Sequence, residues 1–449
     1  MNHKYKALYA QLVESYYQGD FEGTFSKILE EAEEPEKIKE VLAVLCGVEI
    51  DQADTEFNYT QKIIHGLTQN NVRQKIVQKV SSCNTDCEKV DGKSKCQSVC
   101  PLDAIVRDLN SNEKWIDDSL CLNCGRCVEV CEKGNYLDTQ QFLPLAEILR
   151  SKQKVFAIVA PAIAGQFGSE VTLDQLREAF LKLGFTDMVE VALAADILSL
   201  KEAIEFNEHV KKEGDFMITS CCCPMWVAAL RKVYHEFITE VSPSVSPMIA
   251  MARILKSLDQ DAKVVFVGPC VAKKAEAKEK DLAGDVDYVL TFQELEIIFE
   301  SLHINPEKLT GVPTVDYASK GGRMYGRTGG VSSAVWDIVE QIFPEKRELF
   351  QAVQVDGMRE CKALLDELRE GKIKASFIEG MGCKGGCVGG PKAIVDKDTG
   401  REAVEKMAVD SAVKIPVHSE VLLNMLKKIG VEDVKDLKHG NEMFERSFQ

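Results

Sequence analysis

Hydrophobic and polar residues follow a helical period through the first part of the chain. In the stretch TFSKILEEAEEPEKIKEVLAVLCG, apolar residues recur every three or four positions between charged ones, which predicts amphipathic helices with a break at Pro35. No metal-ligand pattern accompanies them. We therefore expect residues 1–80 to form a helical extension that packs on the rest of the chain or on a partner subunit, with Cys46 as a small core residue.

From about residue 139 the pattern changes to short apolar runs that alternate with helical ones. A connecting helix is expected at 139–152. The runs typical of buried strands are then KVFAIVAPAI, DFMITS, AKVVFVGPC, LFQAVQV and ASFIEGM, and helical runs such as TLDQLREAFLKLGF and ECKALLDELREG lie between them. This alternation predicts an α/β fold with parallel sheets flanked by helices, and two similar α/β halves are compatible with it.

Length and charge narrow the picture further. A chain of 449 residues exceeds what one hydrophobic core usually serves, so we expect three parts: 1–80, 81–138 and 139–449. The formal charge of −16 disfavours nucleic acid or an anionic membrane as a partner. The first residues lack an apolar signal core, and the longest apolar stretch, at 41–50, is too short to span a bilayer. We therefore expect a cytoplasmic protein whose cysteines hold metal rather than pair with one another.

Eight cysteines are concentrated in residues 81–138. Four of them have the two-two-three spacing of a bacterial ferredoxin motif, in which the last cysteine reaches the neighbouring cluster. A second set has looser spacing but ends in the expected Cys-Pro pair at Pro101. A crossed arrangement would hold two 4Fe-4S clusters, one on Cys121, Cys124, Cys127 and Cys100, the other on Cys83, Cys87, Cys96 and Cys131. Zinc sites are the less favoured alternative.

Three further cysteine segments follow strand-like runs in the second half of the chain. They are TSCCCPMW (219–226), VGPCVAKKAEA (267–277) and EGMGCKGGCVGGP (379–391). Each places a thiol beside a Pro or Gly that favours a turn, at a strand end where open α/β sheets bind ligands. Four sulfurs from distant sequence could therefore converge on one iron-sulfur cluster.

Across about residues 80 to 430 these motifs resemble those of the FeFe-hydrogenases. Their active centre, the H-cluster, is a 4Fe-4S cubane joined through a cysteine to a two-iron unit with CO, cyanide and a bridging dithiolate. The resemblance implies a catalytic domain of two α/β lobes after a ferredoxin-like α+β domain. It also implies four cubane ligands, of which Cys387 bridges to the two-iron unit. These ligands are Cys223, Cys270, Cys383 and Cys387.

The resemblance also implies residues that hold the two-iron unit without a covalent bond. Lys273 corresponds to an ammonium that binds one cyanide, a pairing that would compensate a buried cation. Pro161, Ala162 and Ser246 correspond to residues around the other cyanide. Met381 would pack on the two-iron unit, and Tyr325 would form an aromatic wall.

Proton delivery is implied by a further set of matches. Cys222 corresponds to the thiol that exchanges a proton with the bridging dithiolate, and Glu202 and Glu205 share one helical face. With Ser242 they give a relay of Glu202, Ser242, Glu205 and Cys222, and burial is expected to suit its carboxylates to proton transfer. The alternative is a solvated helix face.

Some positions depart from the pattern of the active enzymes. Gly268 replaces a Met, Met248 replaces a polar residue that points at the two-iron unit, and Cys221 replaces a Ser. Similar changes accompany divergent members of the family that are associated with sensing. Cys221 could be a second thiol near the site or a buried spectator.

These matches predict an iron-only hydrogenase that interconverts protons, electrons and H2 through an H-cluster and two 4Fe-4S clusters. The alternatives are a slow H2 sensor and an iron-sulfur scaffold without the two-iron unit. The expected partners are a redox protein such as ferredoxin, hydrogenase maturation proteins, a signalling partner for the sensor, and a second copy of the chain.

Overall fold

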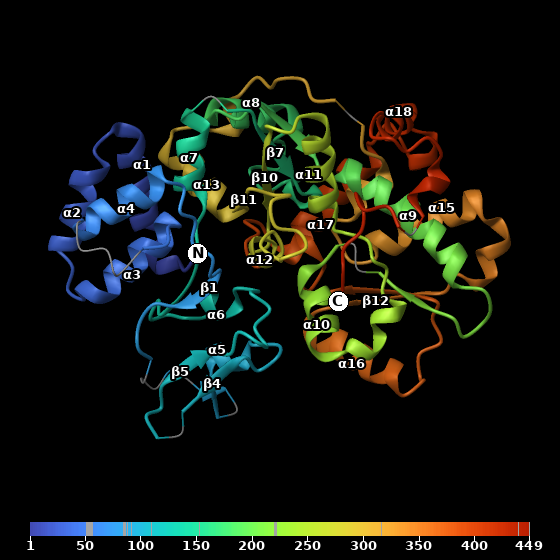
Figure 1. Ribbon diagram of the computed structural model, residues 1–449, viewed down its shortest axis with the longest axis horizontal. Helices are drawn as coiled ribbons and strands as arrows, with labels where there is room; N and C mark the ends of the chain where they lie inside the picture. Colours follow the sequence, from blue (N-terminus) through green and yellow to red (C-terminus); the bar gives the residue numbers. More distant parts are fainter. Residues whose placement is uncertain are drawn as a thin grey trace.

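The structure is a computed structural model that describes most of the chain. It covers residues 1–50, 57–83, 87, 89–90, 92–108, 110–151, 153–219, 222–315, 317–438 and 440–448. Two α/β lobes lie side by side, and the helical N-terminal part and the cysteine-rich part adjoin the first lobe (Figure 1). The expected α/β class with parallel sheets is confirmed.

Within residues 1–50 and 57–76, the N-terminal part contains four α-helices. They are α1 (Lys6–Gln18), α2 (Phe21–Glu30), α3 (Pro35–Cys46) and α4 (Tyr59–Thr68). Pro35 is the first residue of α3, where its missing N–H costs nothing, so the expected break is a helix start. Helix α1 packs on α13 (Phe292–Ser301) of the first lobe, and Cys46 is fully buried. The extension thus packs on its own chain.

The cysteine-rich part is built from short strands and two single-turn helices. They are β1 (Val77–Lys79), β2 (Lys89–Val90), β3 (Lys93–Ser94), α5 (Lys95–Ser98), β4 (Ile105–Arg107), β5 (Lys114–Ile116), α6 (Arg126–Glu129) and β6 (Tyr136–Asp138). Strand β1 pairs antiparallel with β6, with Val77 opposite Asp138. Its sheet therefore begins within residues 1–80, where a helical extension is expected.

The first lobe contains a four-stranded parallel sheet in the order β11-β10-β7-β8. Its strands are β7 (Val155–Val159), β8 (Asp187–Glu190), β10 (Lys263–Gly268) and β11 (Tyr288–Thr291). Its helices are α7 (Phe142–Arg150), α8 (Leu173–Leu183), α11 (Pro247–Leu258), α12 (Ala272–Glu276) and α13. Four of the five residues of β7 are buried, as expected for a strand covered on both faces.

The second lobe contains a three-stranded parallel sheet in the order β12-β13-β9. Its strands are β9 (Met217–Ile218), β12 (Ala352–Asp356) and β13 (Phe377–Met381). The remaining helices are α9 (Ala192–His209), α10 (Pro224–Val233), α14 (Lys320–Met324), α15 (Gly330–Ile342), α16 (Met358–Arg369), α17 (Lys397–Val409) and α18 (Glu420–Lys428). Helix α9 is buried on nearly every side from Ala192 to Phe206, so even its charged residues lie inside the protein.

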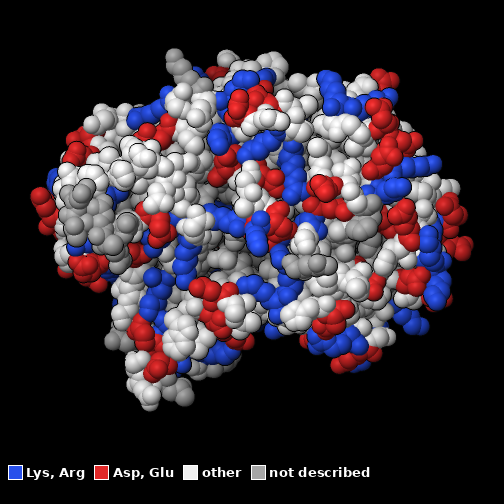
Figure 2. All heavy atoms as spheres, viewed as in Figure 1, with Lys and Arg blue, Asp and Glu red and all other residues white. Residues whose placement is uncertain are grey.

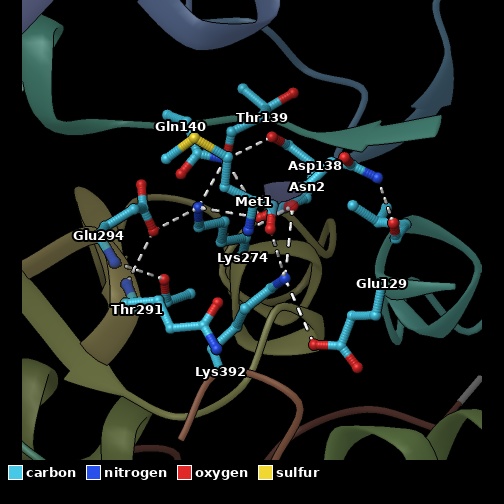
Figure 3. Close-up of polar contacts among 12 residues, drawn as sticks. Met1, Asn2, Glu129, Asp138, Thr139, Gln140, Lys274, Thr291, Glu294 and Lys392 are labelled. Carbon is cyan, nitrogen blue, oxygen red and sulfur yellow. Dashed lines mark hydrogen bonds and ion pairs between the residues drawn. The ribbon is translucent and has the colours of Figure 1, made fainter. Parts of the chain in front are cut away.

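A buried ionic cluster joins the three parts of the chain (Figure 3). Asp138, at the end of β6, lies 2.9 Å from the amino nitrogen of Met1, 3.8 Å from Lys392 Nζ and 4.0 Å from Lys274 Nζ. Lys274 also lies 2.7 Å from Glu294 on α13. Burial alone would raise the pKa of Asp138, but the three nitrogen groups lower it. The cluster ties the cysteine-rich part to the first lobe and to the loop that follows β13.

The surface is mixed in charge, but Lys and Arg side chains gather in the middle of one face, between the cysteine-rich part and the lobes (Figure 2). A hollow there is lined by Cys121, Arg231, Lys232, Lys278 and Lys280, among others. In the part of the chain that the structure describes, no helix combines the length and apolarity needed to cross a bilayer.

Candidate functional site

The three cysteine segments of the lobes all follow the carboxyl ends of parallel strands. Cys270 follows β10, Cys383 follows β13, and Cys223 caps α10, just beyond β9. Strands β13 and β9 are neighbours, with Ile378 opposite Ile218, so their loops emerge side by side. Pro224 begins α10 and sets the turn that leaves Cys223 in extended conformation.

Backbone contacts join these segments into one site. The Gly382 N–H donates to Cys223 Sγ at 3.2 Å, and the Lys392 N–H donates to the Pro269 carbonyl at 3.0 Å. Gly386 has φ +86° and lies against backbone atoms of Arg327 and Thr328, so a side chain there would collide. The Gly-rich spacing between Cys383 and Cys387 therefore permits this close approach.

The four sulfurs influence one another electrostatically. Burial, with smaller contributions from Cys223 and Cys387, raises the pKa of Cys270 to about 12. Burial likewise raises the pKa of Cys383 well above its usual range, with Cys270, Cys223 and Cys387 adding to the effect. Each sulfur thus lies within electrostatic reach of the others, and the structure brings the four predicted ligands together.

The four cysteines of this site are of the ligand type that iron-sulfur clusters use. Within the described residues, no three His, Cys, Asp or Glu side chains come close enough to share one metal ion. A cubane needs wider spacing, because each cysteine binds a different iron. Cys223 is buried and Cys270, Cys383 and Cys387 are partly buried, and four cysteines are the ligand set that a 4Fe-4S cluster takes.

Two polar groups of the site lack the hydrogen bonds that buried groups normally make. Lys273 Nζ and Ser246 Oγ are both buried and, among the described residues, neither has a hydrogen-bond partner. Lys273 does form an ion pair with Glu276 at 2.7 Å. Burial opposes the charge of Lys273, but Glu276, Cys222 and Cys270 raise its pKa. These two residues are the ones that the resemblance assigns to cyanide, and their unused donors fit anionic ligands.

The apolar residues assigned to the same pocket also adjoin one another. Pro161 and Ala162 form a short turn after β7, and a side chain at Gly326 would lie 3.3 Å from the Ala162 nitrogen. Tyr325, next to Gly326, is buried and its hydroxyl lies 2.9 Å from Ser199 Oγ. Met381, the last residue of β13, is 1% exposed and lies two residues before Cys383.

Cys222 is positioned beside the predicted bridging ligand. Its thiol hydrogen-bonds to Cys387, and this bond is the main reason why the pKa of Cys387 is lowered although burial opposes the change. The charge of Lys273 lowers the pKa of Cys387 as well. Cys387 thus differs from the other three sulfurs of the site, whose pKa values burial raises.

Three of the predicted relay residues, Glu202, Glu205 and Ser242, make buried hydrogen bonds, and Thr219 is an additional partner. Ser242 Oγ donates to Glu205 at 2.7 Å, whereas Glu202 accepts a hydrogen bond from Thr219 Oγ1 at 2.8 Å. Glu205 and Ser242 line a hollow at the surface, and Glu202 is fully buried. Glu205 and Ser242 are therefore the relay residues nearest the surface hollow, and the order in which the relay would pass a proton stays a prediction. Thr219 lies in the TSCCCPMW segment, but no sequence pattern marks it as a relay residue.

The departures from the family pattern have different structural settings. The ring of Phe266 occupies the space that a side chain at Gly268 would fill, at 2.6 Å from its ideal Cβ, and lies 5.9 Å from Lys273 Nζ. Met248 is buried on α11. Cys361 is fully buried and donates to the Met381 carbonyl, consistent with a core role. Cys221 lies outside the described residues.

The eight cysteines of the cysteine-rich part fall into two groups. One closed, mainly apolar cavity is lined by Cys100, Cys121, Cys124 and Cys127. In the other group, the pKa values of Cys87 and Cys96 are raised by burial and then by Cys83 and Cys131. The two groups have the membership of the crossed arrangement.

Backbone amides point at several of these sulfurs. The N–H groups of three residues donate to cysteine sulfurs at 3.2 to 3.4 Å. The pairs are Ala104 with Cys100, Asn123 with Cys121 and Asn135 with Cys131. Amide hydrogen bonds to sulfur stabilise cluster charge and tune its potential. Asn123 and Gly125 have positive φ values, which turn the loop around the cavity.

One arginine connects this part to the site between the lobes. Arg126, between Cys124 and Cys127, donates to the Gly382 carbonyl at 3.0 Å and lowers the otherwise raised pKa of Cys383. The cavity of Cys124 and Cys127 is therefore adjacent to the four-sulfur site.

Comparison with known proteins identifies this architecture. The sequence model of the family "Iron only hydrogenase large subunit, C-terminal domain" matches residues 153–391. Iron hydrogenase 1 of Clostridium pasteurianum is 28% identical over 393 residues, which cover 67% of this chain and 68% of that protein. Cytosolic iron-sulfur assembly component 3 of Rattus norvegicus is 23% identical over 350 residues, 64% of this chain and 74% of that protein.

A solved structure of an [FeFe]-hydrogenase from Chlamydomonas reinhardtii shares the fold, with a TM-score of 0.53 at 22% identity. It covers 65% of this chain and 93% of that one. Because the family match extends over more than half of the sequence, the chain belongs to the iron-only hydrogenase large-subunit family.

Proposed function

We propose that the chain is an iron-only hydrogenase that interconverts two protons, two electrons and H2. The observation that carries the proposal is two buried polar groups beside four convergent cysteines. They are the Ser246 hydroxyl, which has no hydrogen-bond partner among the described residues, and the Lys273 ammonium, which pairs there with the Glu276 carboxylate. A protein that held only a cubane would have no use for these donors. Anionic cyanide ligands would use them, as the resemblance implies.

The residues present fit an H-cluster. Cys223, Cys270 and Cys383 would hold the cubane, and Cys387, whose pKa is already lowered, would be the bridging thiolate. When bound, the two-iron unit supplies the site at which H2 is formed or split. Exclusion of water from the loaded site would strengthen the interaction of Lys273 with an anionic ligand.

Cys222 would be the last protein group of the proton path. It reaches Cys387 from inside the site, while Glu205 and Ser242 open onto a surface hollow. Glu202, which accepts a hydrogen bond from Thr219, would pass protons from Glu205 and Ser242 towards Cys222. Each of these groups can donate or accept a proton, as a relay requires.

The two cysteine groups near α5 and α6 would hold 4Fe-4S clusters that conduct electrons. Cys131 is the informative ligand. In the sequence it is the last cysteine of the motif that begins at Cys121, but its charge acts on Cys87 and Cys96 of the other group. We predict that Cys131→Ser selectively impairs that cluster, whereas Cys124→Ser impairs the other. Electron paramagnetic resonance of the reduced variants, with iron analysis, measures the loss. Impairment of the Cys124 cluster by Cys131→Ser would contradict the crossed arrangement.

The partners follow from this chemistry. A low-potential carrier such as ferredoxin would donate electrons, and maturation proteins would insert the two-iron unit. We infer that the carrier approaches the hollow beside Cys121, where Lys232 donates to the Cys121 carbonyl at 2.8 Å and Lys280 is exposed. Chemical cross-links between the carrier and these lysines are the measurement. We propose that the chain meets the carrier and the maturation proteins in the cytoplasm. A second copy of the chain is a further proposed partner, and the mass of the protein in solution tests it.

A slow H2 sensor that signals to a partner protein is a second candidate, favoured by Gly268 and Met248. Phe266 fills the space beside Gly268 and approaches Lys273, so the surroundings of the two-iron unit would differ from those of the active enzymes. A role in iron-sulfur assembly is the third candidate function, because some relatives are named as iron-sulfur assembly components.

One experiment separates the three functions. The full chain is loaded with a synthetic two-iron precursor and examined by infrared spectroscopy, and H2 evolution is then measured with a strong reductant. Bands of bound CO and cyanide with fast evolution support the enzyme, and the same bands with slow evolution support the sensor. Absence of the bands would leave the assembly role and overturn the proposal.

A further inference from the structure

A fully buried lysine lies next to the proton relay on α9. Lys201 forms an ion pair with Glu205, four residues on, and its Nζ lies 3.0 Å from Glu445 Oε1. A buried ammonium is costly unless it is compensated, and here two carboxylates compensate it. Lysine before glutamate is the less favourable order for an ion pair within a helix. Helix stability therefore does not account for Lys201.

Glu445 is held in place by the segment that carries it. Residues 443–446 lie antiparallel to residues 243–245, with hydrogen bonds from Val245 N–H to the Phe444 carbonyl and from Arg446 N–H to the Pro243 carbonyl, both 2.9 Å. The Gly440 N–H donates to the Glu445 carboxylate at 3.0 Å. The carboxylate therefore faces Lys201 from a fixed backbone.

Glu205 lies at the point where this ionic group meets the relay. One of its oxygens pairs with Lys201, and the other accepts the hydrogen bond from Ser242 at 2.7 Å. The surface hollow that Glu205 and Ser242 line begins here. The charged or titratable groups around Glu205 are Lys201, Glu202, Glu208 and His209 on α9, Glu240 on the segment before Ser242, and Glu445 and Arg446 on the other strand.

We propose that Lys201 and Glu445 are positioning residues that together set how readily Glu205 accepts and releases a proton. The proposal rests on the relay described above. The Lys201 ammonium contacts both Glu205 and Glu445, so the two carboxylates share one cation. One cation between two carboxylates leaves Glu205 able to change its protonation without leaving Ser242.

Two single variants are expected to have opposite effects. Glu445→Gln leaves Lys201 entirely to Glu205, so the midpoint at which Glu205 takes up a proton moves to lower pH. Lys201→Met leaves two carboxylates facing each other, so the midpoint moves to higher pH. Shifts of roughly one to three pH units are typical for a charge at this range. In the double variant the two effects oppose each other, and the midpoint returns toward that of the parent.

Infrared difference spectra of the full-length protein, recorded along a pH titration, measure the midpoint. The Glu205 carboxylic acid band is identified by its loss in Glu205→Gln. Because this readout does not need the two-iron unit, it can fail or succeed independently of hydrogenase activity. Lys201→Arg keeps the charge and is expected to keep the parental midpoint.

Shifts of opposite sign, with rescue by Lys201→Arg, support the proposal. Shifts of the same sign, or unchanged midpoints, overturn it, because a merely structural role predicts no dependence on the sign of the removed charge. If Lys201→Met does not fold, Glu445→Gln and Lys201→Arg still decide between these outcomes.

Discussion

Replacing Lys273 with Met is expected to prevent stable loading of the two-iron unit while leaving the cubane in place. The variant removes the buried ammonium that would bind an anionic ligand, and no cysteine is changed. Loss of one partner of a buried charge pair costs about 2–5 kcal/mol, which corresponds to roughly 30-fold or more weaker retention. Infrared bands of CO and cyanide should fall accordingly, and iron bound to the four cysteines should not.

The design must account for Glu276, which pairs with Lys273 at 2.7 Å and is 2% exposed. Lys273→Met alone would strand this carboxylate and destabilise the fold, so Lys273→Met with Glu276→Gln is the better variant. Lys280→Met, an exposed lysine close in sequence, is the matched control. Parental band intensity in the double variant would show that Lys273 does not anchor the unit.

Lys273 could be named as a candidate from the sequence because it stands in a short motif that resembles one of the FeFe-hydrogenases. Cys270 and Lys273 lie within four residues, so their spacing fixes their relative positions once α12 forms. The same holds for Cys383 and Cys387, and for the eight ferredoxin-type cysteines. Local spacing carries this information, and the structure groups these residues as the motifs suggest.

Other features depend on contacts between distant segments, which no local pattern encodes. Glu445 forms an ion pair with Lys201, although more than two hundred residues separate them in the sequence. Thr219 donates a hydrogen bond to Glu202 because α9 packs on the second sheet. In the sequence alone, where these partners cannot be recognised, Lys201 looks like an ordinary helix residue. The sequence of α9 also lacks an amphipathic pattern, because a helix that is buried on nearly every side has no polar face that would show its orientation.

The fold shows the same division between local and distant information. The alternation of strand-like and helical runs predicted parallel sheets, and runs such as KVFAIVAPAI and ASFIEGM correspond to β7 and β13. Strands β8 and β11, each four residues long, were not recognised, because so short a run gives little periodicity. The strand orders β11-β10-β7-β8 and β12-β13-β9 come from crossover connections and packing.

Replacing Cys222 with Ala should preserve the infrared bands and remove most of the turnover. The thiol hydrogen-bonds to Cys387 and is the innermost group of the proposed relay, so its loss breaks proton transfer without removing a cluster ligand. Loss of a positioned acid or base typically lowers a rate by about 100-fold or more. H2 evolution with a strong reductant, at matched cofactor content, measures the effect.

Two controls separate proton transfer from packing. Cys361→Ala removes another buried thiol, which donates to the Met381 carbonyl at 3.4 Å, and should cost stability with little loss of turnover. Cys222→Ser keeps a hydrogen-bonding hydroxyl but replaces the thiol with a much weaker acid, so it should remain slow. If Cys222→Ala evolves H2 at the parental rate, protons reach the site by a route that does not pass through Cys222, and the relay ends at another residue.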